Sequence, residues 1–265
     1  MPVFTPTPKQ LGAATVATNN FIIELHKPLT SYTSKTIGWF YHRPYDFGVG
    51  SCALVGGGAT LVGRGLGPVI DAHDHVIRVN RLPTNSSHYR DVGRRTSVWF
   101  AKMCRLKPFH SGPKAALRLL VMNSKLKTGD ADDGPSGYCP LDGPAARCPF
   151  GAFVARGGFK DPKDNKCITM GSRVLSGRQS ASFPVGLVDE PVWDAALAMR
   201  HGREASTGLH AILAFAPRCR GGLHLYGFSG NGTNDGHHIG HALSIEHKLL
   251  GELAQRSGGR IEIVT

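Results

Sequence analysis

The amino-acid sequence predicts an α/β fold with a mostly parallel central sheet flanked by helices. Short apolar runs, of the kind that form buried strands, alternate along the chain with longer segments whose apolar residues recur at helical spacing. Such alternation is typical of parallel sheets with helical connections. The 265 residues are 41% apolar, which is enough for one substantial core.

The N-terminal part of the chain, residues 1–45, is rich in Thr, Pro and aromatic residues and shows weak periodicity. We expect an irregular lead-in there, with one short strand or helix near Phe21–Leu25. Buried strands are expected next, at Cys52–Val55, Val76–Val79 and Ser97–Phe100. The periodicity of Ala115–Met122 does not decide between helix and strand.

Residues 128–172 are the least regular part of the sequence. They contain Gly, Pro and Asp residues and three cysteines with little apolar rhythm, so we expect a long surface insertion. Beyond it, helices are expected at Val192–Arg200, Thr207–Ala216 and Ile239–Gln255, and strands at Leu223–Tyr226 and Ile261–Val264. The expected organisation is therefore one domain over residues 46–265.

The charge of the chain favours an anionic partner. The formal net charge is +12, from 31 Lys and Arg residues against 19 Asp and Glu residues. This balance suits nucleic acid, an anionic membrane or a phosphorylated or carboxylated small molecule. The basic residues are scattered, without a run of five or more and without interleaved aromatic residues. That pattern argues against a nucleic-acid groove.

The six cysteines form no C-x-x-C pair, which argues against a structural zinc site. Their even number and wide spacing suit disulfides in an oxidising compartment, and buried free thiols are the alternative. Glycosylation sequons beginning at Asn85 and Asn231 are compatible with secretion. No apolar stretch approaches the ~20 residues of a spanning helix, and the N-terminus shows no secretory signal. We therefore expect no membrane anchor in this chain.

A glycine-rich loop, Gly56-Gly57-Gly58, directly follows the first predicted strand. Glycine lets backbone N–H groups approach an anion closely, so the loop is a candidate phosphate cradle. It does not complete the dinucleotide fingerprint, because Leu61 stands where the third glycine belongs, and no P-loop lysine follows. Taken alone, a glycine-rich turn without a ligand is an equal alternative.

Three blocks of sequence carry a resemblance to a known family. The first block comprises Cys52-Ala-Leu-Val-Gly56, Gly67-Pro-Val-Ile-Asp71, His73-Asp74, Val76-Ile-Arg78-Val-Asn80, Pro83-Thr84 and Asp91-Val-Gly93. The second runs from Ser206-Thr207-Gly208 through Cys219 to Leu223-His-Leu-Tyr226-Gly227-Phe228, and the third is His241-Ala-Leu-Ser-Ile-Glu246. In order and spacing they resemble the large, small and very small sialyl motifs of the animal-type sialyltransferases, and the chain resembles a divergent member of that family.

The resemblance implies a Rossmann-like glycosyltransferase fold of the GT-A-like type and a disulfide between Cys52 and Cys219, with two buried thiols as the alternative. It implies a donor site built from Gly56, Gly57, Gly58, Asn80, Ser206, Thr207, Gly208 and Gly227. Ser206 or Thr207 alternatively caps the following helix, and both roles can coexist. Family members usually have an asparagine where this chain has Gly57.

The resemblance also implies roles for residues near the C-terminus. His241 matches the catalytic histidine, which takes a proton from the acceptor hydroxyl. His238, with His237 as the fallback, matches the histidine that lies against the donor phosphate and stabilises it as it leaves. Glu246 is expected to be structural and to anchor its helix to the donor loops.

The implied activity is transfer of sialic acid, or a related keto-acid sugar, from a CMP-sugar donor to a hydroxyl of a glycan acceptor. Family members invert the anomeric centre, need no metal ion or other cofactor, and work in the Golgi lumen. A CMP-sugar has a single phosphate, so we expect Asp130-Ala-Asp132-Asp133 to be a solvated turn rather than a metal site. We also expect the cluster Asp71–His75 to be structural.

Two other functions stay open. A dinucleotide-dependent oxidoreductase would use the same glycine loop, but Val79-Asn80-Arg81 lacks the acidic residue expected at the end of the second strand. A non-catalytic protein of the same fold would bind a nucleotide or a glycan. The presence of His241, Asn80 and Ser206–Gly208 argues against this second alternative.

Overall fold

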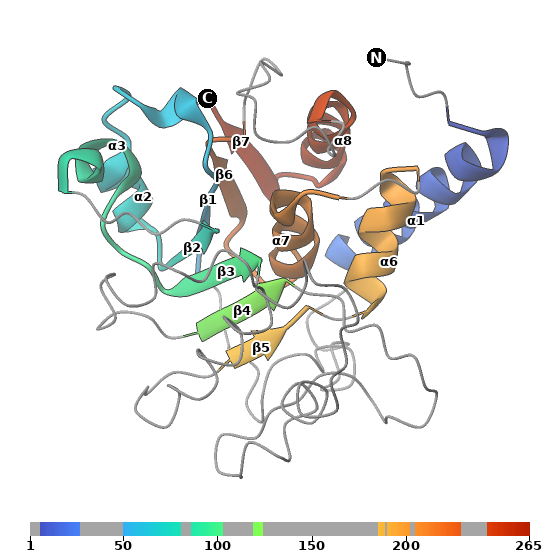
Figure 1. Cartoon of the computed structure of the whole chain (residues 1–265), viewed down its shortest axis with the longest axis horizontal. Coiled ribbons are helices and arrows are strands. Elements are labelled where there is room, and N and C mark those ends of the chain that lie inside the picture. The colour runs from blue at the N-terminus through green and yellow to red at the C-terminus, as the bar shows by residue number, and fades with distance from the viewer. Residues whose placement is uncertain are drawn as a thin grey trace, which may run out of the picture.

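The computed structural model describes residues 6–26, 50–80, 86–102, 119–123, 185–188, 190–201, 205–228 and 243–265. Within these ranges the strands form one seven-stranded sheet, and every pairing in it is parallel (Figure 1). The strands are β1 (Cys52–Val55), β2 (His75–Val79), β3 (Val98–Lys102), β4 (Leu119–Asn123), β5 (Val185–Leu187), β6 (Leu223–Tyr226) and β7 (Ile261–Val264). The helices are α1 (Pro8–His26), α2 (Gly67–Ala72), α3 (Tyr89–Val92), α6 (Glu190–Met199), α7 (Thr207–Phe215) and α8 (Leu243–Arg256), with 3-10 turns η2 (Ala59–Leu61) and η3 (Ser86–His88).

The strand order in the sheet is β5-β4-β3-β2-β1-β6-β7. Strands β1 to β5 follow one another toward one edge, and β6 and β7 then continue from the other side of β1. The direction of strand addition reverses between β1 and β6, so this pair is the topological switch point of the sheet. The predicted α/β class with a mostly parallel sheet is confirmed.

Helices lie on both faces of this sheet (Figure 1). On one face, α1, α6, α7 and α8 enclose the larger core, which contains Leu54, Phe100 and Leu225 from the strands. Phe215 of α7 meets Phe100 there edge to face, with 5.6 Å between the ring centroids. On the other face, Ile70 of α2 packs against the alternate side chains of the central strands. Both faces are covered, as is usual for a parallel sheet.

Helix α1 corrects the expectation of an irregular lead-in over residues 1–45. The segment Pro8–His26 is one continuous helix, and Phe21 and Leu25 are buried in the larger core. The element expected near Phe21–Leu25 is therefore the end of a longer helix. Ala14, Thr18, Phe21 and Leu25 recur at the spacing of one helix face, and all four are buried. Thr18 fits there because its hydroxyl donates to the carbonyl oxygen of Ala14 at 2.9 Å.

The start of α1 has a local cause in the sequence. Gln10 donates its backbone N–H to Thr7 Oγ1 at 3.3 Å, and Thr7 donates its own N–H to Gln10 Oε1 at 2.8 Å. This reciprocal pair is a capping box, and Pro8 at the first helical position needs no hydrogen-bond acceptor. The tetrapeptide Thr-Pro-Lys-Gln therefore begins a helix in a segment whose overall composition suggests a loop.

Most of the remaining elements overlap the segments expected from periodicity, and the exceptions are short. Leu119–Asn123 is a strand, which settles the ambiguity of Ala115–Met122. The short helices α2 and α3, the turns η2 and η3 and the three-residue strand β5 were not expected, because each is too short to show a repeated hydrophobic pattern. The expected insertion at 128–172 lies outside the described residues. None of the helices in the described ranges is long and apolar enough to cross a membrane.

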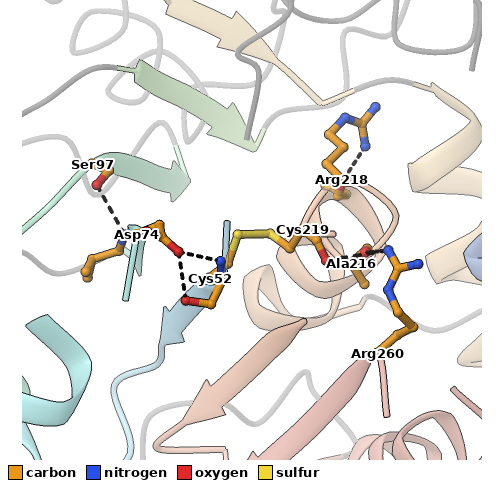
Figure 2. Close-up of a disulfide and its surroundings, with 10 residues drawn as sticks. Cys52, Asp74, Ser97, Ala216, Arg218, Cys219 and Arg260 are labelled. Atoms are coloured by element: carbon orange, nitrogen blue, oxygen red, sulfur yellow. Dashed lines mark hydrogen bonds between the residues drawn. A yellow bond between two sulfur atoms is a disulfide. The ribbon is translucent and has the colours of Figure 1, made fainter. Parts of the chain in front are cut away.

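Cys52 and Cys219 form a disulfide that joins the start of β1 to the turn after α7 (Figure 2). This is the pairing that the resemblance implies. Both cysteines are fully buried, and 167 positions of sequence separate them. Arg260 supports the same turn, since its guanidinium lies 3.5 Å from the carbonyl oxygens of Ala216 and Cys219. The bridge therefore connects the first and second sialyl-like blocks at the centre of the sheet.

Replacing both bridged cysteines with alanine is expected to lower the free energy of unfolding by about 2–5 kcal/mol. The bridge restricts the unfolded chain over a long loop, and its removal also leaves a gap among buried apolar side chains. Urea unfolding of the double variant, followed by circular dichroism, measures the loss. An unfolding midpoint equal to that of the oxidised wild-type chain would contradict this expectation.

Candidate functional site

The candidate site lies at the carboxyl ends of β1 and β6. In open parallel sheets, ligands bind in the crevice beyond the carboxyl ends of the strands at the switch point. Gly56–Gly58 follows β1 at this place, and Gly227-Phe228 follows β6. The two loops are joined directly, because Gly56 donates its N–H to the carbonyl oxygen of Tyr226 at 2.8 Å. The predicted glycine loop therefore occupies the position where this fold class binds its ligands.

The two loops approach so closely that only glycine fits at one position. A Cβ atom on Gly58 would lie 2.4 Å from the carbonyl oxygen of Gly227, which is well inside contact distance. Gly227 itself has φ +75°, a conformation that favours glycine. A Cβ on Gly57, in contrast, would meet nothing within 4 Å. The nearby backbone of Gly227 thus leaves no room for a side chain at Gly58, whereas a Cβ at Gly57 has space.

The N-terminus of α7 forms the next part of the site. Ser206 caps this helix, since its Oγ accepts the N–H of Leu209 at 3.1 Å. The N–H groups of Thr207 and Gly208 have no acceptor among the described residues. Free N–H groups and the positive end of the helix dipole make such a terminus suitable for an anion.

Phe228 brings the glycine loop and the α7 terminus together. A Cβ atom on Gly208 would lie 2.8 Å from Phe228 Cε1, and one on Gly56 would lie 3.1 Å from Phe228 Cε2. The ring therefore lies against the backbone of both segments, and the absence of side chains at Gly56 and Gly208 permits this contact. Phe228 was not among the predicted site residues, although it belongs to the second sialyl-like block.

The N–H, the carbonyl oxygen and the Oγ of Ser206 all form hydrogen bonds within the protein. Its N–H donates to Glu246 Oε1 at 2.7 Å, and its carbonyl oxygen accepts His210 Nδ1–H at 2.8 Å. Glu246 lies in the first turn of α8 and is 4% exposed. It also forms an ion pair with Arg200, with 3.3 Å between Arg200 Nε and Glu246 Oε1. Glu246 thus anchors α8 to the start of α7.

Asp91 holds the distal part of the loop that follows β1. Its carboxylate accepts the N–H groups of Gly63 at 2.9 Å and Gly65 at 2.8 Å. These two hydrogen bonds lower the pKa of Asp91, since they stabilise the charged carboxylate. Both glycines have positive φ angles, so the carboxylate stabilises a turn that other residues would adopt with strain. Sequence reasoning placed Asp91 in a motif without assigning it this role.

The Asp91→Asn variant is expected to melt a few degrees lower than the wild-type chain at neutral pH. Because the folded-state pKa of Asp91 is lowered, its contribution is present above the unfolded-state value of about 3.9 and is lost as pH falls through the folded-state pKa. The difference in Tm between the two proteins should therefore shrink on acidification. Thermal unfolding between neutral and strongly acidic pH measures this trend, and a constant difference would contradict it.

Asn80 lies at the carboxyl end of β2, beside β1. Its φ of 59° is in the left-handed region, which asparagine adopts more readily than most residues. Two contacts hold this conformation, as its N–H donates to the Phe100 carbonyl oxygen at 2.8 Å and its own carbonyl accepts Trp99 Nε1–H at 3.3 Å. Asn80 is therefore on the same edge of the sheet as the glycine loop, one strand away.

The structure brings all eight predicted donor residues to this edge, namely Gly56, Gly57, Gly58, Asn80, Ser206, Thr207, Gly208 and Gly227. His238 and His241, predicted as the catalytic residues, lie outside the described residues, as does the acidic segment 130–133. Among the described residues, no group of three or more His, Cys, Asp or Glu side chains is placed to hold a metal ion.

The side chains of the Asp71–His75 cluster bind other parts of the protein. Asp71 accepts the N–H groups of Arg94 and Arg95, and Asp74 accepts the Ser51 N–H at 2.8 Å. His73 Nε2 lies 2.9 Å from the Tyr226 hydroxyl. These contacts hold the end of α2 and the start of β2, in line with a structural role.

Comparison with known proteins agrees with this arrangement. Residues 17–116 match the model of glycosyltransferase family 29 (sialyltransferase). Over 70 residues the chain is 39% identical to beta-galactoside alpha-2,6-sialyltransferase 2 of Gallus gallus, an alignment that covers 24% of this chain and 13% of that protein. Over 121 residues it is 31% identical to type 2 lactosamine alpha-2,3-sialyltransferase of Rattus norvegicus, covering 41% of this chain and 35% of the rat protein. The resemblance to animal-type sialyltransferases is confirmed.

The whole described fold is also similar to that of a solved sialyltransferase. The crystal structure of a mammalian sialyltransferase matches 98% of this chain and 86% of its own with a TM-score of 0.52 and 18% sequence identity. This likeness confirms the GT-A-like fold that the resemblance implies. The aligned segments span about a third or less of the two sialyltransferase sequences above. The activity of this chain is therefore given below as a proposal.

Proposed function

We propose that this protein transfers sialic acid, or a related keto-acid sugar, from a CMP-sugar donor to a hydroxyl of a glycan acceptor. One observation carries the proposal. The first and second sialyl-like blocks, which are far apart in the sequence, meet at the switch point of a parallel sheet, where the glycine loop lies close to the N-terminus of α7. The family match of residues 17–116 and the names of the aligned relatives support the same reaction class.

The donor is held at this edge of the sheet by backbone groups more than by charged side chains. The N–H groups of Thr207 and Gly208 and the dipole of α7 attract an anionic group of the donor. The Gly56–Gly58 loop lets the nucleotide approach the backbone closely, and Asn80 contacts the nucleotide from the end of β2. The scattered positive charge of the chain adds a general attraction for this anionic substrate.

The reaction proceeds as a direct displacement at the anomeric carbon of the donor sugar. The acceptor oxygen forms a bond to the anomeric carbon of the donor sugar while the bond from that carbon to the phosphate oxygen breaks. CMP leaves with the bonding electron pair, and the anomeric centre is inverted. His241 takes the proton of the acceptor hydroxyl as general base, and His238 stabilises the negative charge that develops on the departing phosphate.

Neither a metal ion nor another cofactor takes part in this scheme. A CMP-sugar carries one phosphate. Its leaving group, CMP, therefore does not require the divalent cation that neutralises a departing nucleoside diphosphate. The buried Cys52–Cys219 bridge suits an oxidising compartment. We place the activity in the Golgi lumen, in keeping with the family that the chain resembles.

Release of CMP from CMP-sialic acid tests the proposed function. We expect the purified, oxidised protein to release CMP, more rapidly with a mixture of galactose-terminated glycans, and to the same extent with a chelator present. The same assay with a UDP-sugar serves as the donor control and should give no release. Saturable CMP binding without release from CMP-activated keto-acid sugars would favour a non-catalytic binding protein. Absence of both binding and release would refute a nucleotide-sugar site altogether.

A further inference from the structure

A buried ion pair lies directly behind the N-terminus of α7. Arg200, at the end of α6, has a fully buried side chain, and the Glu246 side chain is 6% exposed. Arg200 Nε lies 3.3 Å from Glu246 Oε1, and the same oxygen accepts the Ser206 N–H at 2.7 Å. Three helices, α6, α7 and α8, thus meet at one carboxylate oxygen.

The position of this carboxylate matters for the neighbouring site. A carboxylate at the N-terminus of a helix is attracted by the same N–H groups and dipole that would bind an external anion. Without compensation, Glu246 would lower the positive potential that Thr207 and Gly208 present. Burial strengthens this effect, because little water is present to screen the charge.

Arg200 supplies the compensating charge. Its guanidinium is buried beside Glu246, and its two terminal nitrogens have no hydrogen-bond acceptor among the described residues. A buried charge whose hydrogen bonds are so incompletely met is costly, and a pair of apolar side chains would often be at least as stable in its place. The arrangement is therefore poorly explained by stability alone.

We propose that Arg200 is a positioning residue that neutralises Glu246, so that Glu246 can hold Ser206 while the N-terminus of α7 keeps its affinity for the anionic donor. This inference rests on the proposed function, because it assumes that an anionic group of the donor binds at α7. It concerns a residue outside all three sialyl-like blocks. It also links the start of α8, two positions after His241 in the sequence, to the donor site.

The test compares CMP with cytidine, which lacks the phosphate. Calorimetric Kd values for both ligands give a ratio that reports recognition of the negative charge and cancels general damage to the site. In Arg200→Met, the preference for CMP over cytidine should fall by about tenfold, because Glu246 then repels the phosphate. In Glu246→Gln, whose amide oxygen can still accept the Ser206 N–H, the preference should rise severalfold. The double variant should return close to the wild-type ratio.

The preference for CMP over cytidine should change in opposite directions in the two single variants, and this distinguishes the proposed role of Arg200 from a structural one. If Arg200 and Glu246 only hold the helices together, both variants would weaken CMP and cytidine binding in parallel, and that result would overturn the proposal while leaving the proposed function intact. Should Arg200→Met fail to fold, Glu246→Gln tests the proposal by itself. A rise in its preference for CMP over cytidine supports the proposal, and an unchanged or lower preference contradicts it. A wild-type chain that binds neither ligand would refute both proposals.

A matched control is available elsewhere on α8. Arg256 and Glu252 form an exposed pair, with 2.7 Å between Arg256 Nη1 and Glu252 Oε1. The Arg256→Met variant removes the same kind of charge from the surface, away from the start of α7. It should leave the ratio of CMP to cytidine affinity unchanged, and a change as large as that in Arg200→Met would show that net charge, rather than the position of Arg200, is responsible.

Discussion

The His241→Ala variant is expected to lower kcat for transfer from CMP-sialic acid by about 10²–10⁴-fold, with little change in CMP affinity. A positioned general base contributes a factor of this size, because the acceptor hydroxyl is a poor nucleophile until its proton is removed. His241 precedes α8 by two positions in the sequence, and Glu246 joins the first turn of α8 to Ser206 at the proposed donor site. We propose that CMP binds at the glycine loop and the N-terminus of α7, so CMP binding should persist in the His241→Ala variant.

Steady-state kinetics together with calorimetric CMP binding separates these two quantities. His26→Ala is the matched control, because His26 is exposed at the end of α1, where its Nε2 lies 3.3 Å from the Arg256 carbonyl oxygen. It should retain wild-type kcat. Full activity of His241→Ala would show that another group removes the proton, and parallel loss of CMP affinity would assign His241 to donor binding.

The Gly58→Ala variant is expected to weaken CMP binding and to reduce kcat/KM by about 100-fold or more. Its Cβ would lie 2.4 Å from the Gly227 carbonyl oxygen, so the loops that follow β1 and β6 would have to separate. The atoms that this Cβ would meet all belong to the backbone of Gly227, which cannot rotate away as a flexible side chain can. A displacement of about 1 Å in groups that position a substrate costs a factor of this order.

Gly57→Ala provides the matched comparison in the same loop. A Cβ at Gly57 meets nothing within 4 Å, so this variant should keep the Tm and most of the CMP affinity of the wild-type chain. Members of the family that the chain resembles usually carry an asparagine at this position. Equal effects of the two substitutions on CMP binding would contradict the proposed contact between Gly58 and Gly227.

The sheet and the glycine loop could be predicted because their signals are local in the sequence. The apolar runs of β1, β2, β6 and β7 each stand between polar or glycine-rich segments. The glycines after β1 then occupy the carboxyl end of a buried strand, which is where a parallel sheet binds its ligands. The disulfide came from the resemblance, since sequence spacing alone does not select one pairing among six cysteines.

Helix α1 shows that a local signal can also be overlooked. Threonines and a proline lower the average helix propensity of Pro8–His26, and composition alone suggests a loop. The capping box of Thr7 and Gln10 and the recurrence of Ala14, Phe21 and Leu25 are both present in the sequence. Reading the cap together with the apolar spacing would have predicted the helix.

The contacts that assemble the site could not be predicted in the same way. Phe228 lies against Gly56 and Gly208, and Asp91 binds Gly63 and Gly65, across separations that depend on the complete fold. Arg200 looks like the charged end of an ordinary helix in the sequence. Only the three-dimensional arrangement shows that it is fully buried beside Glu246.

A crystal structure of the oxidised protein with CMP would show whether CMP binds where the loops after β1 and β6 meet the N-terminus of α7. We expect CMP density in contact with Gly56–Gly58 and Ser206–Gly208, with Asn80 against the nucleotide and an anionic group at the N–H groups of Thr207 and Gly208. CMP bound at another edge of the sheet, with the α7 terminus unoccupied, would contradict the proposed donor site.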